Sequence, residues 1–354
     1  MTAFLRICWV VLVSSALGIL SIGSGCRKDR PPIKTEPVKI PVGSDGVFVS
    51  NEGNFMFGNA SISYYAEGME EAIEDLFKPA NNRPLGDVCQ SMYVFNNRFY
   101  IVVNNSGKIE VVHPVTFAAT ATFTGFISPR YIQPVSNAKA YVTDLYAQAI
   151  SIVNLATGHL TGSIPCPGWT EELRLAYGKV FVTNRSRPFV YVINTQQDVV
   201  VDSIPVGYGA QSIVEDKNGK LWVLCSGHSD SGEKASLHRM DPVHHWVEST
   251  LEFPSLNDAP WRLDINGTLD TLYFLNGDVY RMSITETTLP SIPFISAQGR
   301  NFYGLGIHPR KGFVYVADAL DYIQRGRVYV YRPDGSLHTS FLAGIIPGDF
   351  YFFP

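Results

Sequence analysis

Charge of either sign is scarce in this chain of 354 residues. Asp, Glu, Lys and Arg make up 17% of the sequence, and the 32 acidic residues slightly outnumber the 28 basic ones. Proteins neutralise a phosphate backbone with an excess of Lys and Arg, so the composition argues against nucleic acid as a partner. With 45% hydrophobic and 12% aromatic residues, the chain is also too apolar for a disordered protein.

Cysteine is rare as well, with five residues in all. Cys8 and Cys26 lie near the N-terminus, whereas Cys89, Cys166 and Cys225 are far apart in the remainder of the chain. They show no paired short spacing, so the sequence indicates neither a disulfide framework nor a zinc site. We expect the last three to be small buried residues.

Catalytic signatures are missing too. The sequence contains no Gly-x-Ser-x-Gly, no phosphate-binding loop and no dinucleotide fingerprint. His228, Asp230 and Glu233 fall within one short stretch, but their spacing matches no established set of metal ligands. The sequence therefore predicts no catalytic residues, no metal site and no cofactor.

The one long hydrophobic run lies at the N-terminus. It extends from Ile7 to Ile22, is short for a membrane-spanning helix, and ends in small residues before Cys26. This arrangement resembles a lipoprotein signal, with an uncleaved anchor as the alternative. We predict a signal peptide over residues 1–25, lipidation of Cys26, and a proline-rich tether over residues 26–45 that holds a folded body, residues 46–354, at an outer membrane.

Glycine and proline, in contrast, are plentiful. The 30 Gly and 22 Pro are spread along the chain and interrupt it too often for long helices. A β-rich segment with a polar end recurs seven times, its copies begin 40 to 53 residues apart, and its fourth residue is Asn or Asp in six of them. The copies are Phe48-Val49-Ser50-Asn51, Ile101-Val102-Val103-Asn104, Tyr141-Val142-Thr143-Asp144, Phe181-Val182-Thr183-Asn184, Trp222-Val223-Leu224-Cys225, Tyr273-Phe274-Leu275-Asn276 and Tyr315-Val316-Ala317-Asp318.

Further β-like runs precede and follow each copy, which gives four strands per repeat. The repeats extend from Gly46 to Gly344 with a period of about 43 residues, which is typical of propeller blades. We therefore predict an all-β fold, a seven-bladed β-propeller with four-stranded antiparallel blades. The first blade has no room for its own innermost strand, and Asp349 to Phe353 form a spare β-like segment. We expect this C-terminal strand to close the ring.

One segment departs from the pattern. Apolar residues between Met69 and Phe77 have helical spacing, although the blade requires an outer strand there. Because tertiary context often overrides local pattern, we expect an irregular outer strand or a single helical turn.

The copies that begin at Tyr141 and Phe181 resemble the YVTN, or YncE-like, propeller repeat. Other motifs are similar to those of Bacteroidota surface lipoproteins of the DUF5074 type, whose BtuG-like members bind cobalamin. These motifs are Phe48 to Phe55, Arg83 to Asp87, Gln90-Ser91-Met92, Ala343 to Gly348 and, as an export signal, Cys26-Arg27-Lys28-Asp29. The resemblance implies a lipid-anchored protein that faces the cell exterior and passes a captured ligand to a TonB-dependent outer-membrane transporter.

Candidate binding residues come from two kinds of loop that open on one face of a propeller: those between the second and third strands of a blade, and those between blades. Their aromatic and Arg residues suit a ligand with an apolar ring system and a polar or anionic rim, such as a corrinoid. The candidates are Asn51, Asn54, Phe55, Phe57, Arg130, Tyr146, Trp169, Arg185, Arg187, Tyr208, Trp261, Arg262, Arg300, Tyr303 and Tyr322.

Several alternatives to a corrinoid site remain open. A glycan or a peptide fits such a face almost as well, so the protein could be a surface scaffold; a propeller hydrolase or lyase is a third possibility. The Asn and Asp residues could instead cap the turns that follow their strands, and the loop aromatics could pack between blades.

Overall fold

The computed structural model describes residue 40 and residues 45–352 of the chain. The predicted signal peptide, the lipidation site at Cys26 and nearly all of the predicted tether lie outside the described residues. Within the described part, no helix is both long enough and apolar enough to cross a membrane.

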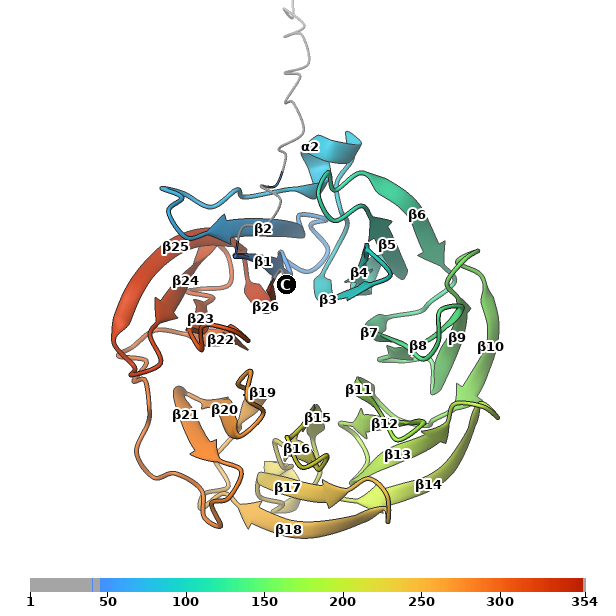
Figure 1. Ribbon diagram of the computed structural model, residues 1–354, viewed down its shortest axis with the longest axis vertical. Helices are drawn as coiled ribbons and strands as arrows, with labels where there is room; N and C mark the ends of the chain where they lie inside the picture. Colours follow the sequence, from blue (N-terminus) through green and yellow to red (C-terminus); the bar gives the residue numbers. More distant parts are fainter. Residues whose placement is uncertain (1–39, 41–44, 353–354) are drawn as a thin grey trace, which may run out of the picture. The chain divides into compact units, whose positions relative to one another are not determined.

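Seven antiparallel sheets stand around a central axis and confirm the predicted seven-bladed β-propeller (Figure 1). From the innermost strand outward, blade 1 consists of β26 (Pro347–Phe352), β1 (Gly46–Asn51) and β2 (Ser61–Ala66); blade 2 of β3 (Cys89–Phe95), β4 (Arg98–Val103), β5 (Lys108–Val112) and β6 (Ala119–Thr124); and blade 3 of β7 (Pro129–Pro134), β8 (Lys139–Asp144), β9 (Ala149–Asn154) and β10 (Leu160–Pro165).

The other four blades follow in chain order. Blade 4 consists of β11 (Thr170–Ala176), β12 (Lys179–Asn184), β13 (Phe189–Asn194) and β14 (Val199–Pro205); blade 5 of β15 (Ala210–Glu215), β16 (Leu221–Cys225), β17 (Ser236–Asp241) and β18 (Trp246–Glu252); blade 6 of β19 (Trp261–Ile265), β20 (Thr271–Asn276) and β21 (Asp278–Ser283); and blade 7 of β22 (Phe302–Ile307), β23 (Val314–Asp318), β24 (Arg325–Tyr331) and β25 (Leu337–Ile345). The innermost strands of neighbouring blades contact one another around the whole ring.

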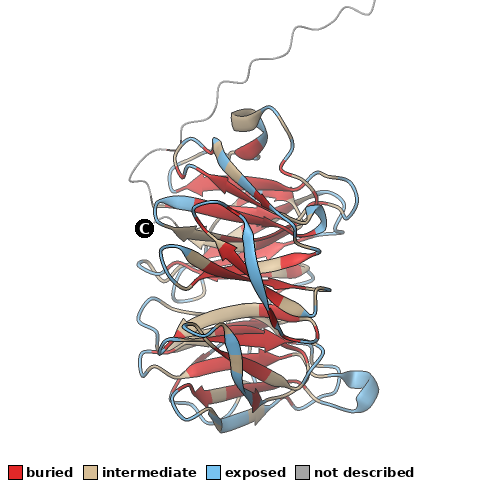
Figure 2. Ribbon diagram, turned by 90° about the vertical axis from the view of Figure 1, so that its right-hand side faces the viewer, coloured by how far each residue is buried: buried red, intermediate tan, exposed pale blue. Residues whose placement is uncertain are grey.

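Burial follows the position of a strand within its blade. The second strands, such as β4 and β8, are buried almost throughout because neighbouring blades cover both of their faces. The outermost strands, such as β14 and β18, are mostly exposed. In the side view of Figure 2 the buried residues accordingly lie in the strands, and the exposed ones gather at the loops and outer edges.

The C-terminal strand closes the ring, as expected. β26 pairs antiparallel with β1, so the two ends of the described body share blade 1. The fully buried Asn51 amide reinforces the closure: its Nδ2 donates to Ser63 Oγ (2.9 Å), and its Oδ1 accepts from the backbone N–H of Gly344 (2.9 Å). A Cβ at Gly344 would lie 2.6 Å from Ser61 Oγ, so the chain passes this point too closely for a side chain.

Two blades have an irregular outer position. In blade 1, Ile73 forms an isolated bridge with Tyr64, and a short helix, α2 (Phe77–Asn81), follows. Between Met69 and Phe77 the outer position is thus irregular, with a single bridge at Ile73, and the helical turn begins only at the last residue of this segment. In blade 6, Ile295 forms an isolated bridge with Val279 where a fourth strand would pair. The sequence Pro290-Ser291-Ile292-Pro293 lies beside it, and its two prolines cannot donate to a strand ladder.

Candidate ligand-binding site

A β-bulge interrupts every innermost strand close to its first residue. In six blades this is where the blade begins, and in β26 it is where the chain arrives from blade 7. All seven pairings between an innermost strand and the second strand shift register there. A bulge bends the strand and re-aims the extra residue. The bulge residues include Gln90, Arg130, Tyr131, Glu171, Glu172, Gln211, Arg262, Tyr303 and Gly348.

These bulges build the wall of a cavity on the propeller axis. Eight of the nine named bulge residues, all except Gly348, line an inner cavity of about 210 Å³, together with residues that include Glu52, Trp169, Arg185 and Trp261. The loops of blades 5 and 6 line a wider outer pocket of about 650 Å³. Arg185, Gln211 and Trp261 belong to both linings, so the two spaces meet at these side chains.

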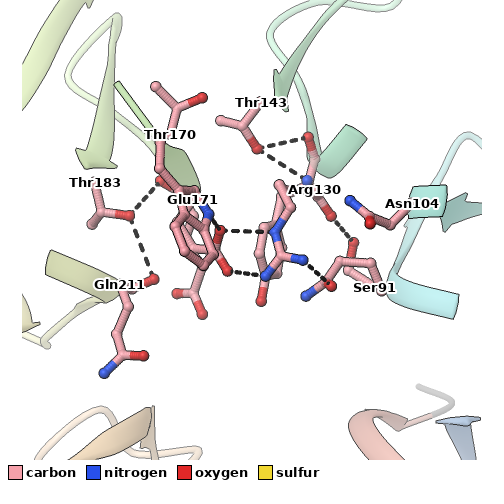
Figure 3. A network of polar contacts seen from close by, with 12 residues as sticks. Ser91, Asn104, Arg130, Thr143, Thr170, Glu171, Thr183 and Gln211 are labelled. Atoms are coloured by element: carbon pink, nitrogen blue, oxygen red, sulfur yellow. Dashed lines mark hydrogen bonds and ion pairs between the residues drawn. The ribbon is translucent and has the colours of Figure 1, made fainter. Parts of the chain in front are cut away.

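An ion pair at the junction of blades 3 and 4 forms one side of the inner cavity. Arg130 donates through Nε and Nη2 to the two carboxylate oxygens of Glu171, at 2.8 and 2.5 Å, and through Nη1 to Gln90 Oε1 (Figure 3). The indole Nε1 of Trp169 donates to the same carboxylate at 2.6 Å. The Arg185 guanidinium lies over the Trp169 ring, 4.3 Å from its centroid. Stacked in this way, the ring and the guanidinium hold each other in place.

A second group of side chains comes from blades 6, 7 and 1. The guanidinium of Arg262 lies over the Trp261 ring, and that ring meets Tyr303 edge to face with centroids 4.6 Å apart. Tyr303 donates its hydroxyl hydrogen to Glu52 Oε1 at 2.9 Å. Arg262 Nη2 lies 3.8 Å from the same oxygen, too far for a hydrogen bond, and Nη1 is 3.4 Å from the Tyr131 hydroxyl.

The carboxyl groups of this cavity differ in their protonation. Burial raises the pKa of Glu172 to about 8, so this side chain is mostly neutral at pH 7. Burial also raises the pKa of Glu52, although Arg262 and Tyr303 oppose the shift. In Glu171 the bidentate Arg130 outweighs burial and lowers the pKa. The cavity therefore combines Glu171, whose ionised form is favoured, and Glu172, which is mostly neutral at pH 7, with three Arg side chains.

The structure brings six of the predicted binding residues together at the axis: Arg130, Trp169, Arg185, Trp261, Arg262 and Tyr303. Tyr322 adjoins them through its ring contact with Tyr303, and Asn54 donates to the backbone carbonyl of Tyr322. Phe55, Phe57, Tyr146 and Arg187 are exposed and line neither cavity, and Tyr208 lies beside His228 at the outer pocket.

Two predicted residues lie elsewhere. Asn51 is buried in the ring closure, and its amide is occupied there. Arg300 lines a separate cavity of about 280 Å³ beside the β24–β25 turn, with its guanidinium over the Tyr329 ring. Among the described residues, no three His, Cys, Asp or Glu side chains gather as metal ligands would, and this includes His228, Asp230 and Glu233.

The loop-based prediction missed Glu52, Gln90, Tyr131, Glu172 and Gln211 as members of the site. Except for Glu52, which follows β1, these residues occupy the bulges and not the loops. A usable signal was present in the repeat, because in blades 2 to 7 the bulge opens the hairpin that ends on an anchor position such as Asp144 or Asn184. Aligning the repeats on the anchors would have placed these side chains in one ring.

Solved structures with the same architecture have low sequence identity to this chain. A quinonprotein alcohol dehydrogenase-like protein from Bacteroides thetaiotaomicron has a TM-score of 0.70 at 15% identity, covering 87% of this chain and 78% of its own. Hydrazine synthase from Kuenenia stuttgartiensis has a TM-score of 0.58 at 13% identity, covering 81% of this chain and 95% of its own. Apo AztD from Citrobacter koseri has a TM-score of 0.56 at 9% identity, covering 88% of this chain and 98% of its own. At these identities the likeness demonstrates the fold alone.

Comparison by sequence adds the family. The uncharacterized protein YwhL of Bacillus subtilis is 33% identical over 100 residues, which are 28% of this chain and 20% of that protein, so the chain spans about a fifth of this relative's length. A family model described as "Domain of unknown function (DUF5074)" matches residues 45–340, which is most of the propeller. The chain therefore belongs to the DUF5074 family.

Proposed function

We propose that this protein binds a corrinoid on the loop face of its propeller. The observation that carries the proposal is the pair of joined cavities on the axis, in which Trp169 and Trp261 stand beside the guanidinium groups of Arg185 and Arg262. Indole rings provide flat apolar surface, and Arg and Gln side chains bond amide oxygens and phosphate. A macrocycle with amide-bearing arms has matching chemistry.

The size of the two spaces supports this arrangement. The inner cavity of about 210 Å³ accepts one arm or group of a large ligand, and the outer pocket of about 650 Å³ gives room for part of a ring system. Gln211 lies where the two meet, and its Nε2 already donates to the carbonyl of Pro260 at 2.7 Å, which leaves its Oε1 as an acceptor for a ligand amide.

We further propose that the protein is anchored to the outer membrane through Cys26, faces the cell exterior, and passes its ligand to a TonB-dependent transporter. The motif resemblance to BtuG-like surface lipoproteins and the proline-rich segment before Gly46 support this part. A gene for such a transporter beside the gene for this protein would support it further.

Titration with cyanocobalamin tests the ligand. We expect calorimetry to detect binding at micromolar concentration or below, and Trp261→Ala to weaken it by about tenfold or more, since buried Trp side chains often dominate binding energy. Trp246→Ala is the matched control, because Trp246 is 59% exposed at the start of β18, far along the blade from the axis. The absence of heat and of co-elution at micromolar concentration would contradict the proposal.

A surface scaffold is the second candidate, favoured by one observation. Phe55, Met56 and Phe57 are 64%, 78% and 77% exposed in consecutive positions of the β1–β2 loop. Consecutive exposed apolar side chains are typical of surfaces that contact another macromolecule. A stable complex with another surface protein in the absence of any small ligand would favour this candidate over corrinoid binding.

A further inference from the structure

Arg262 is a buried cation with little to bind inside the protein. Its side chain is only 11% exposed, and its Nε has no hydrogen-bond partner in the described part of the chain. Its other contacts are a 3.4 Å hydrogen bond to the Tyr131 hydroxyl, a 3.8 Å approach to Glu52 and the face of the Trp261 ring, whose centroid is 4.9 Å away. A guanidinium has five N–H donors, and leaving buried donors unmatched is unfavourable. This side chain is arranged to meet an acceptor that comes from outside.

The backbone at this position is held in an unusual conformation. Arg262 lies in the β19 bulge with φ of 56°, in the left-handed region that residues other than Gly and Asn seldom adopt. Such strain concentrates at functional sites. The bulge of β26 places Gly348 next to this guanidinium, where a Cβ would be 3.3 Å from Arg262 Nη2 and 2.9 Å from Glu52 Oε1. The glycine therefore leaves space beside the guanidinium.

Arg185 is the second cation with free donors. Its guanidinium stacks on Trp169, and no side-chain hydrogen bond or ion pair of Arg185 is found among the described residues. Arg130 provides a contrast within the same cavity, because Glu171 and Gln90 occupy its donors. Arg130 is thus a structural cation, whereas Arg185 and Arg262 are available to a ligand.

The charge balance of the inner cavity agrees with this distinction. Glu171 compensates Arg130, and Glu172 is mostly neutral at pH 7 because burial raises its pKa to about 8. Burial also raises the pKa values of Glu52 and Asp349, the two other carboxyl groups that face Arg262. Neither of these two carboxyl groups accepts a hydrogen bond from Arg262 within the described part of the chain, so its donors stay available to a ligand.

We propose that the inner cavity is an anion site, in which Arg185 and Arg262 bind a carboxylate or phosphate group of the ligand. Trp169 and Trp261 flank the site, so its natural occupant is an amphipathic anion whose charged group enters the cavity while an attached flat ring lies in the outer pocket. The inference does not require the ligand to be a corrinoid.

Small anions test the site directly. We would titrate the protein at low ionic strength with inorganic phosphate, acetate and benzoate, and follow heat together with the NMR signals of arginine Nε–Hε groups. We expect at least one anion to bind in the millimolar range and to shift the Arg262 signal. Arg185→Gln and Arg262→Lys should each weaken binding by about tenfold, since a charge-assisted hydrogen bond contributes on that scale. Phosphate binding alone, or carboxylate binding alone, would identify the charged group.

The matched control is Lys234→Gln, which removes one exposed charge from the β16–β17 loop without touching either cavity. If Lys234→Gln weakened anion binding as much as the two Arg variants do, the binding would be due to general surface charge and the proposal would be overturned. It would also be overturned if none of the three anions bound. Arg185→Gln removes no internal hydrogen bond, so it keeps the test valid if Arg262→Lys does not fold. If cyanocobalamin binds and none of the three anions does, the anion site is contradicted and the proposed corrinoid binding stands. If an anion binds and cyanocobalamin does not, the anion site stands and the proposed corrinoid binding is contradicted.

Discussion

At the scale of single residues, the Asn and Asp anchors serve the ring more than they serve a ligand. Asn104 Nδ2 donates to the carbonyl of Pro129 at 2.9 Å, and Asp144 Oδ2 accepts from the N–H of Ser128 at 2.8 Å. The first bond joins the end of β4 in blade 2 to the start of blade 3, whereas the second ties β8 to the segment that begins its own blade. The alternative considered from the sequence, that these residues satisfy nearby backbone, explains their recurrence at a fixed place in the repeat.

Another buried residue makes stability depend on pH. His238 in β17 accepts a hydrogen bond at Nε2 from the N–H of Gly207 (3.0 Å), and its Nδ1 contacts Thr250 Oγ1 (3.0 Å). Ser236 Oγ also lies 2.8 Å from Nε2. These contacts fit the neutral imidazole, and burial lowers the pKa of His238 to about 4.

We predict that His238 destabilises the folded protein as the pH falls. The unfolded chain binds this proton near pH 6.5 and the folded chain only near pH 4, so the free energy of unfolding is unaffected above pH 6.5 and decreases between these values. The loss should reach about 3 kcal/mol below pH 4. Urea unfolding of the wild type and of His238→Gln at pH 7.5, 5.5 and 4.5 measures it. A difference between the two proteins that stays constant with pH would contradict this account.

At the scale of strands and blades, the regular strands could be predicted from the sequence, whereas the places where a strand is irregular could be predicted less well. The recurring run that ends on an Asn or Asp anchor, such as Tyr141 to Asp144, identifies a second strand, because both of its faces pack against neighbouring blades. The outer position of blade 6 is irregular since Pro290 and Pro293 cannot complete a ladder. The two prolines are visible in the sequence. That a single bridge at Ile295 takes the place of the fourth strand could not be predicted from it.

The strand that closes the ring allows a direct test. Deleting residues 346–354 removes β26, exposes the inner edge of β1 and uncovers aromatic residues such as Phe48 that pack against Tyr351. We expect the truncated chain to unfold at least about 10 °C lower than the full one, and to associate through its open strand edge. Thermal unfolding followed by circular dichroism, with size-exclusion chromatography, measures both effects.

A chain that ends at Phe352 is the control for this truncation, because it lacks only the two residues after β26. An unchanged melting temperature for the longer deletion would mean that β26 contributes little to stability. The ring would then be closed by the Asn51 hydrogen bonds and the blade 7 contacts alone.

At the scale of the whole molecule, the sequence predicts the ring better than it predicts the site. The blade count follows from a period that is repeated seven times, so errors in one repeat do not change it. The cavity, in contrast, depends on bulges that bring Gln90, Glu171 and Gln211 together from three blades. Their proximity is a property of the closed ring and not of any one repeat. Since propellers of many activities share this ring, the site and not the fold must identify the function.

The ring also predicts how the molecule unfolds. Cys89 lies in blade 2, Cys166 between blades 3 and 4, and Cys225 in blade 5; all three are free and buried, as expected from the sequence, and burial raises their thiol pKa values. Because each blade is covered by two neighbours, opening one exposes the next, and we expect unfolding to be cooperative. The test uses a chain in which Cys8 and Cys26 are replaced by Ser, so that a thiol reagent can label only these three residues. We expect all three to be labelled with one denaturant midpoint, equal to the midpoint of unfolding followed by circular dichroism. Labelling of one cysteine at a lower denaturant concentration would instead demonstrate that its blade opens independently of the ring.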